Sequence, residues 1–205
     1  MTPMNEDTLV QETTAEYLRD VLGWDVVFAY NNETFGPEGT LGRKDDREVV
    51  LTRYLGEALI NLNQKLPQQA YQEAIRQIAE YSATQSTLQI YREKYELLKN
   101  GVQVQFRDSQ GVLKKEKLRV FDFDQPKNNH FLAVRELWIR RIPYRRRADI
   151  ICFVNGIPLV FMELKNVHKD IRAAYEKNYS DYRDTVPHLF HHNAIIVLAN
   201  GVGAN

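Results

Sequence analysis

Residues 148–165 read ADIICFVNGIPLVFMELK, and this stretch decides the fold. Its two apolar runs, 148–154 and 159–164, have the length and the Ile, Val and Phe content of buried strands. Asn155-Gly156 lies between them, and this dipeptide is the strongest short-range signal of a hairpin turn. The stretch therefore predicts a β-hairpin in the core of the protein.

Three charged residues stand at the ends of the two runs: Asp149 at the start of the first, and Glu163 and Lys165 at the end of the second. Charged side chains are rare in buried strands because their desolvation is costly without a partner. Residues two apart in a strand point to the same face, so Glu163 and Lys165 share one. A strict two-residue turn would set Asp149 opposite Met162, whereas a three-residue turn or a bulge would set it opposite Glu163. If the three residues form one site, the hairpin has an odd-length turn or a bulge.

Two carboxylates beside a lysine are suited to binding Mg²⁺ and acting on phosphate esters. Mg²⁺ prefers oxygen ligands and keeps several waters, so Asp149, Glu163 and the backbone carbonyl of Leu164 could supply part of its coordination. The bound metal would lower the pKa of a water and stabilise charge on a phosphate. Lys165 could orient the attacking water or take its proton. A structural salt bridge between the strand ends would have the same sequence pattern, so this alternative stays open.

The rest of the chain divides into a helical front half and a strand-rich back half. Helical periodicity of the apolar residues predicts front-half helices at residues 7–22, 46–63, 67–81 and 86–99. Short apolar or alternating runs predict further strands at residues 24–30, 102–106, 131–140 and 194–199. A last helix is predicted over residues 169–184, before Pro187.

The composition excludes several classes of protein. The 205 residues carry no net formal charge, so a nucleic-acid surface would need local clusters of charge. Cys152 is the single cysteine, which excludes a disulfide within the chain, and its apolar neighbours predict a small core residue. The polar N-terminus does not resemble a signal peptide and no apolar run is long enough to cross a membrane, so we expect a cytoplasmic protein.

The adjacent His191 and His192 would point to opposite faces of an extended chain, so a shared metal ion is not expected.

Residues 147–166, RADIICFVNGIPLVFMELKN, resemble the nuclease motif of the R subunit of type I restriction-modification enzymes. In that family the motif runs Arg-Pro-Asp, apolar run, Asn-Gly, apolar run with a proline, Glu-x-Lys-Asn. Similarity in the front half, from Gly42-Arg43 onward, and at Pro187-His188-Leu189-Phe190 extends the resemblance from about residue 8 to residue 201.

The resemblance implies a nuclease core of the PD-(D/E)xK type, which is an α/β fold with a mixed central β-sheet flanked by helices, here with a helical elaboration in the front half. It implies that Asp149 and Glu163 bind Mg²⁺, for which Mn²⁺ could substitute, and that Lys165 is the catalytic lysine. It also implies a glutamate of the first helix in the site. Glu12 has about the right spacing, Glu16 is its rival one turn away, and a solvated glutamate without a role is the alternative.

Two departures from the family pattern stand out. Ala148 replaces the proline before the aspartate, and since that proline is not a ligand, activity should survive. The family also has a glutamine and a tyrosine on the helix after the lysine, expected to contact DNA or the site. Tyr182 matches the tyrosine, and Asn178 stands in the glutamine position with an amide that is one methylene shorter.

The activity implied is that of a type I site-specific deoxyribonuclease that cleaves double-stranded DNA without sequence choice of its own. We expect residues 1–205 to form a single endonuclease domain, an N-terminal fragment of a larger R subunit in a prokaryotic cytoplasm. The sequence holds no G-x-x-x-x-G-K-[ST], so ATP would bind only to the full-length subunit. The expected partners are double-stranded DNA and the modification (methyltransferase) and specificity subunits of the restriction complex.

Basic residues gather just before Asp149, and we expect contacts to DNA phosphates from three of them, Arg145, Arg146 and Arg147, next to Arg140 and Arg141. A solvated basic edge strand is the alternative. Two other functions stay open. One is a repair nuclease or junction resolvase of the same fold, and the other is a catalytically silent docking module.

Overall fold

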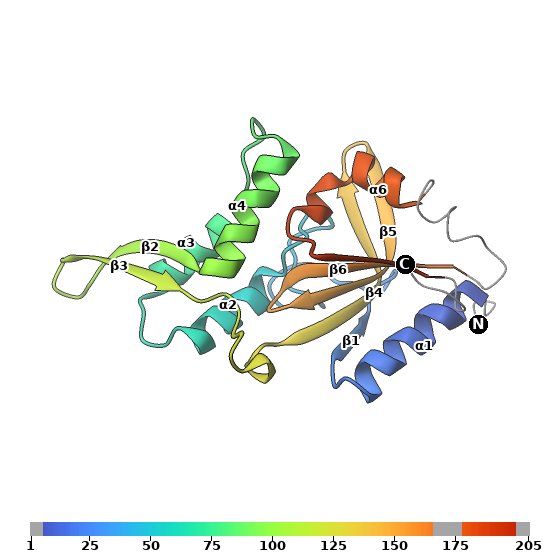
Figure 1. Cartoon of the computed structure of the whole chain (residues 1–205), viewed down its shortest axis with the longest axis horizontal. Helices are drawn as coiled ribbons and strands as arrows, with labels where there is room; N and C mark the ends of the chain where they lie inside the picture. The colour runs from blue at the N-terminus through green and yellow to red at the C-terminus, as the bar shows by residue number, and fades with distance from the viewer. Residues whose placement is uncertain (1–5, 166–177, 200–205) are drawn as a thin grey trace. The chain divides into compact units, whose positions relative to one another are not determined.

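The structure, a computed structural model, describes residues 6–165 and 178–199. Its helices are α1 Glu6–Asp20, α2 Thr52–Leu62, α3 Gln68–Ala79, α4 Thr87–Asn100 and α6 Ser180–Thr185, with short 3₁₀ turns η1 Pro126–Asn128 and η3 Pro187–Phe190 (Figure 1). Its strands are β1 Asp25–Phe28, β2 Val102–Arg107, β3 Leu113–Leu118, β4 Phe131–Arg141, β5 Tyr144–Val154, β6 Ile157–Leu164 and β7 Ile195–Ala199. Residues 169–177 of the helix predicted over 169–184 lie outside the described residues.

The chain divides into two compact units. The sheet unit comprises the described residues up to 49, residues 131–153 and those from 158 onward. The helical unit comprises residues 50–130 and 154–157. The prediction of a single endonuclease domain is not tested by this division and stays a prediction.

The sheet unit is built on five strands in the order β1-β4-β5-β6-β7. β1 pairs with β4 in parallel, and β6 pairs with β7 in parallel. β4, β5 and β6 follow one another through two-residue turns, and such connections join antiparallel strands. The sheet is therefore mixed, as predicted.

Helices cover both faces of this sheet. Ala15 and Leu18 of α1 share a buried cluster with strand residues that include Ile150 and Cys152, which confirms Cys152 as a core residue. On the other face, Phe161 of β6 packs edge-on against Tyr182 of α6, with 5.1 Å between ring centroids. The expected mixed sheet flanked by helices is thus confirmed.

The turn of the β5–β6 hairpin has two residues, so of the two predicted alternatives, an odd-length turn or a bulge, the first is wrong. Asn155 and Gly156 both have positive φ, +50° and +78°, as a type I′ turn requires. Only glycine fits at position 156, because a Cβ there would lie 2.4 Å from the carbonyl oxygen of Leu51. The side chain of Asn155 is fully buried and donates to the carbonyl of Val120 at 2.8 Å.

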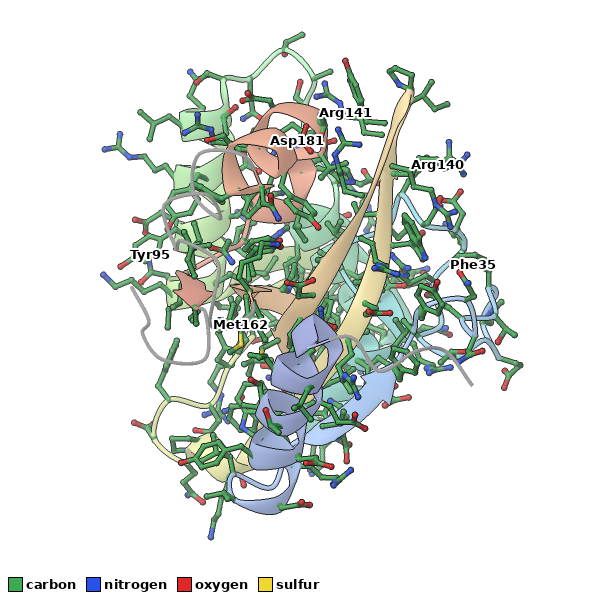
Figure 2. The ribbon with its side chains drawn as sticks, turned by 90° about the vertical axis from the view of Figure 1, so that its right-hand side faces the viewer. Phe35, Tyr95, Arg140, Arg141, Met162 and Asp181 are labelled. Carbon is green, nitrogen blue, oxygen red and sulfur yellow. The ribbon has the colours of Figure 1, made fainter. Side chains whose placement is uncertain are left out.

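The residues that β5 and β6 bury on the same face of the sheet indicate that the pairing of the two strands shifts by one residue along the hairpin. Ile150 of β5 shares one hydrophobic cluster with Met162, labelled in Figure 2, and Leu164 of β6. A regular hairpin with this turn would pair residue 150 with Phe161, and it would put Met162 and Leu164 on the opposite face. One extra residue between the turn and Asp149 restores the observed faces, and this is what the predicted bulge would do.

In the helical unit the predicted helix 46–63 begins only at Thr52, so its first turns are wrong. Asp46 is used elsewhere, because its backbone carbonyl accepts from the N–H of Arg140 and its carboxylate binds Arg140 and Arg145. Tertiary hydrogen bonds thus override helix propensity at this point. The other two predicted helices of this unit match α3 and α4.

Candidate active site

Asp149 lies on β5 far from the turn, and two hydrogen bonds fix its carboxylate. Oδ2 accepts from the backbone N–H of Leu164 at 2.7 Å, and Oδ1 accepts from Nε2 of Gln11 at 2.9 Å. The first bond comes from the neighbouring strand β6 and the second from α1. The sheet and the helix together therefore position this carboxylate.

Glu163 is the more deeply buried of the two carboxylates, at 2% exposed. Its Oε1 accepts from Nζ of Lys165 and from Nδ2 of Asn178. Its Oε2 is buried and has no hydrogen-bond partner among the described residues. An unsatisfied buried carboxylate oxygen is costly, and a cation would satisfy it.

Burial raises the pKa of Asp149 from 3.8 to about 7, helped by the negative charge of Glu163. The N–H of Leu164 and the charges of Lys165 and Arg147 act in the opposite direction. Two carboxylates close together in a dry environment resist being ionised together. Ionisation of Asp149 is therefore disfavoured beside an ionised Glu163.

We expect Asp149→Asn to raise the free energy of unfolding by about 1–2 kcal/mol at pH 8 in EDTA. Asp149 binds its proton more tightly in the folded state than in the unfolded state, so stability falls as pH rises from about 4 to about 7. Asparagine removes this dependence. Its Oδ1 can still accept from the N–H of Leu164, and after a flip of the Gln11 amide its Nδ2 can donate to Oε1 of Gln11.

Urea unfolding at pH 5 and pH 8 measures this effect. The gain over wild type should be larger at pH 8, and the exposed control Asp184→Asn should show no such difference between the two pH values. A destabilised Asp149→Asn protein, or an equal gain at both pH values, contradicts the prediction.

The donor atoms of the site fit Mg²⁺. Within residues 6–165 and 178–199 no cluster of three or more His, Cys, Asp or Glu side chains could hold a metal ion. The site offers instead the carboxylates of Asp149 and Glu163 and the buried amide oxygen of Gln11. Mg²⁺ accepts such a small set of hard oxygen ligands because it retains several waters, whereas Zn²⁺ sites are usually built from nitrogen and sulfur.

Gln11 of the first helix donates a hydrogen bond to one of the two carboxylates, that of Asp149. Gln11 is 4% exposed and lies on the buried face of α1, in line with Ala15 and Leu18. No hydrogen bond or ion pair joins Glu12 to Asp149 in the part of the chain that the structure describes. The sequence signal that could have identified Gln11 is its spacing: it lies four residues before Ala15 and seven before Leu18, on the apolar face of the helix. A role for Glu12 stays a prediction.

Asn178 and Tyr182 both support the site. Asn178 reaches Glu163 in spite of its shorter side chain. Tyr182 is 6% exposed, and its hydroxyl donates to the backbone carbonyl of Arg147, two residues before Asp149. These bonds give both residues a positioning role, and DNA contact by either stays a prediction.

The predicted DNA-contacting arginines are engaged by acidic side chains of the sheet unit. Arg145 pairs with Asp46 at 2.8 Å, and Arg146 pairs with Asp181, labelled in Figure 2. Arg147 lies 3.6 Å from the carboxylate of Glu136. These pairs reduce the net positive charge of the run and leave its contact with DNA as a prediction.

Of the helices in the described part of the chain, none is long and apolar enough to cross a membrane.

Comparison with known proteins places the chain in a family. The model of the type I restriction enzyme R protein N terminus matches residues 3–205. The type I restriction enzyme HindI endonuclease subunit of Haemophilus influenzae is 34% identical over 98% of this chain, and a relative in Methanocaldococcus jannaschii, provisionally named the type I restriction enzyme MjaIXP endonuclease subunit, is 25% identical over 97%. The chain spans 19% of the length of each of these relatives. It therefore belongs to the family of N-terminal regions of type I restriction enzyme R proteins.

Proposed function

We propose that this chain is a Mg²⁺-dependent DNA endonuclease domain that hydrolyses phosphodiester bonds of double-stranded DNA without sequence choice of its own. The observation that carries the proposal is the buried pair of Asp149 and Glu163, with the Nζ of Lys165 on the Glu163 carboxylate. The names of the two relatives, both endonuclease subunits, support the choice of substrate.

Each side chain has a role that its contacts support. Asp149 and Glu163 would hold Mg²⁺, which when bound would supply an activated water and stabilise negative charge on the phosphate. Lys165 would orient the water or hold its proton at Nζ. The amides of Gln11 and Asn178 donate to the two carboxylates and orient them without adding charge. Such supporting bonds tune affinity for a metal ion.

The chain would act as part of a longer subunit. We propose double-stranded DNA, the modification subunit and the specificity subunit as its partners, and ATP as a ligand of the longer protein alone. The family supports this arrangement, since the relatives are more than five times as long as the matched region. A repair nuclease or junction resolvase remains the alternative enzyme, and a silent docking module remains the alternative without activity.

Calorimetry with Mg²⁺ and Mn²⁺, together with nicking of supercoiled plasmid, tests the proposal. Wild type should bind the ions and nick, and Asp149→Asn and Glu163→Gln should do neither, while the exposed control Asp184→Asn should behave as wild type. Binding without nicking would support the metal site and assign DNA delivery to the missing subunits. A folded wild type that binds neither ion would favour the docking module.

A second pair of variants tests whether Gln11 or Glu12 is the residue of the first helix that supports metal binding. Gln11→Ala should weaken Mg²⁺ binding about tenfold, because supporting residues of a metal site typically contribute a factor of about 10–100. Glu12→Gln should leave the affinity within about twofold of wild type, since its carboxylate forms no hydrogen bond or ion pair with the two site carboxylates in the described structure. The reverse result would restore Glu12 as the site residue.

A further inference from the structure

A two-stranded antiparallel ribbon in the helical unit has a face that the proposed active site does not use. β2 and β3 pair over their whole lengths, from Val102 opposite Leu118 to Arg107 opposite Leu113. Val102, Val104 and Leu118 are buried and anchor the ribbon. Gln77 of α3 donates to the carbonyl of Gln103 at 3.1 Å, which ties β2 to the helix beside it (Figure 1).

Every residue on the opposite face of the ribbon is exposed, and this face carries only cations, amides and one leucine. Because cross-strand partners share a face, the register fixes its composition. Its members are the pairs Gln103 with Lys117, Gln105 with Lys115, and Arg107 with Leu113.

No acidic side chain lies on this face. Glu116 pairs with Val104 and therefore belongs to the anchored face. Asp108 accepts from the backbone N–H groups of Gln110 and Val112 in the turn and lies 3.7 Å from Lys114. Neither Lys115 nor Lys117 forms an ion pair within the residues that the structure describes. The face is therefore a patch of uncompensated positive charge on a chain whose net charge is zero.

We propose that this ribbon face is a second DNA-contacting surface, which binds the phosphates of duplex DNA through Lys115, Lys117 and Arg107. The choice of DNA rests on the proposed function. Lysine, arginine and amide side chains are the usual donors to phosphate oxygens, and a two-stranded ribbon is narrow enough to lie in the major groove. Protein interfaces, in contrast, centre on buried apolar anchors and are depleted in lysine, and this face offers a single leucine.

Lysines on an exposed strand also prevent edge-to-edge aggregation, and this is the competing explanation. It predicts that neutral substitutions promote self-association and leave DNA affinity unchanged. The DNA-contact proposal predicts a loss of affinity and a weaker dependence on salt, because each phosphate contact releases a counterion.

The test is binding of a 30-base-pair duplex, followed by fluorescence anisotropy in EDTA so that no cleavage occurs. The ribbon variant carries both Lys115→Gln and Lys117→Gln. The control variant carries both Lys99→Gln and Lys127→Gln, which removes the same charge from exposed positions in the same unit. Far-UV circular dichroism and light scattering check that each protein is folded and monodisperse. A third variant, Lys115→Arg with Lys117→Arg, keeps the charge.

At 0.1 M salt the ribbon variant should bind at least about fivefold more weakly than the control, and its salt slope should be smaller by roughly 2. The arginine variant should bind as wild type does. Equal affinities of the ribbon variant and the control, or no binding by wild type at low salt, would overturn the proposal. If the wild-type protein binds DNA through the ribbon but does not nick plasmid, the ribbon proposal holds and only the proposed nuclease activity is contradicted.

Discussion

Lys165→Met is expected to nick supercoiled plasmid about 10³-fold more slowly than wild type while still binding Mg²⁺. A side chain that orients or deprotonates the attacking water typically contributes about 10²–10⁴ in rate. Lys165 is placed for this role, since its side chain is only 17% exposed and its Nζ donates to the carboxylate of Glu163. Loss of a cation beside the two carboxylates should leave metal affinity unchanged or increase it. The readouts are the rate of open-circle formation and calorimetry with Mg²⁺.

Two further variants separate the possible roles of Lys165. Lys44→Met removes a lysine whose side chain is 86% exposed, and it should nick at the wild-type rate. Lys165→Arg keeps the positive charge, but a guanidinium stays protonated at accessible pH and cannot act as a base. If Lys165→Arg nicks plasmid, the role of Lys165 is to supply charge and orient the water. If Lys165→Arg does not nick, the role of Lys165 is proton transfer. Full activity of Lys165→Met would remove the lysine from the proposed mechanism.

Glu33→Gln is expected to lower the free energy of unfolding by about 3–5 kcal/mol, because it leaves a buried arginine without its counter-ion. Arg43 and Glu33 form a two-pronged pair in which Nε of Arg43 donates to Oε1 of Glu33 at 2.7 Å. Both side chains are almost wholly inaccessible to solvent. The guanidinium also donates to the carbonyls of Glu48 and Trp138, so it cannot turn toward solvent without losing these bonds.

Urea unfolding of the variant measures this loss. The matched control is Asp20→Asn, which removes the acid of an ion pair whose two side chains are more than half exposed, and it should cost less than about 1 kcal/mol. Equal, small costs for the two variants would show that the buried pair contributes no more than a surface pair.

The parts of the fold that the sequence predicts are those set by strong local signals. The Asn155-Gly156 turn and the apolar runs beside it predict the central hairpin, and the spacing of Glu163 and Lys165 predicts their common face. These features depend on residues within one hairpin, where the period of a strand and the geometry of a turn leave few alternatives.

Features set by distant residues are harder to predict. Gln11 lies 138 positions from the carboxylate that it contacts, and a polar residue on a helix is usually solvated. Asp46 is a residue type common at the start of a helix, but its ion pairs with Arg140 and Arg145 hold it in an irregular segment. In both cases the deciding partner comes from a part of the chain that local periodicity does not report.

The turn at Asn155-Gly156 also limits how the protein can be engineered. Hairpin loops are commonly chosen for inserted tags or for new chain ends because they are exposed and tolerate added residues. This turn is buried, and its Gly156 carbonyl accepts from the N–H of Leu51 at 2.8 Å, so an insertion here would disrupt the core. The exposed segment between α3 and α4, at residues 82–84, is the better place for a fluorophore or an epitope.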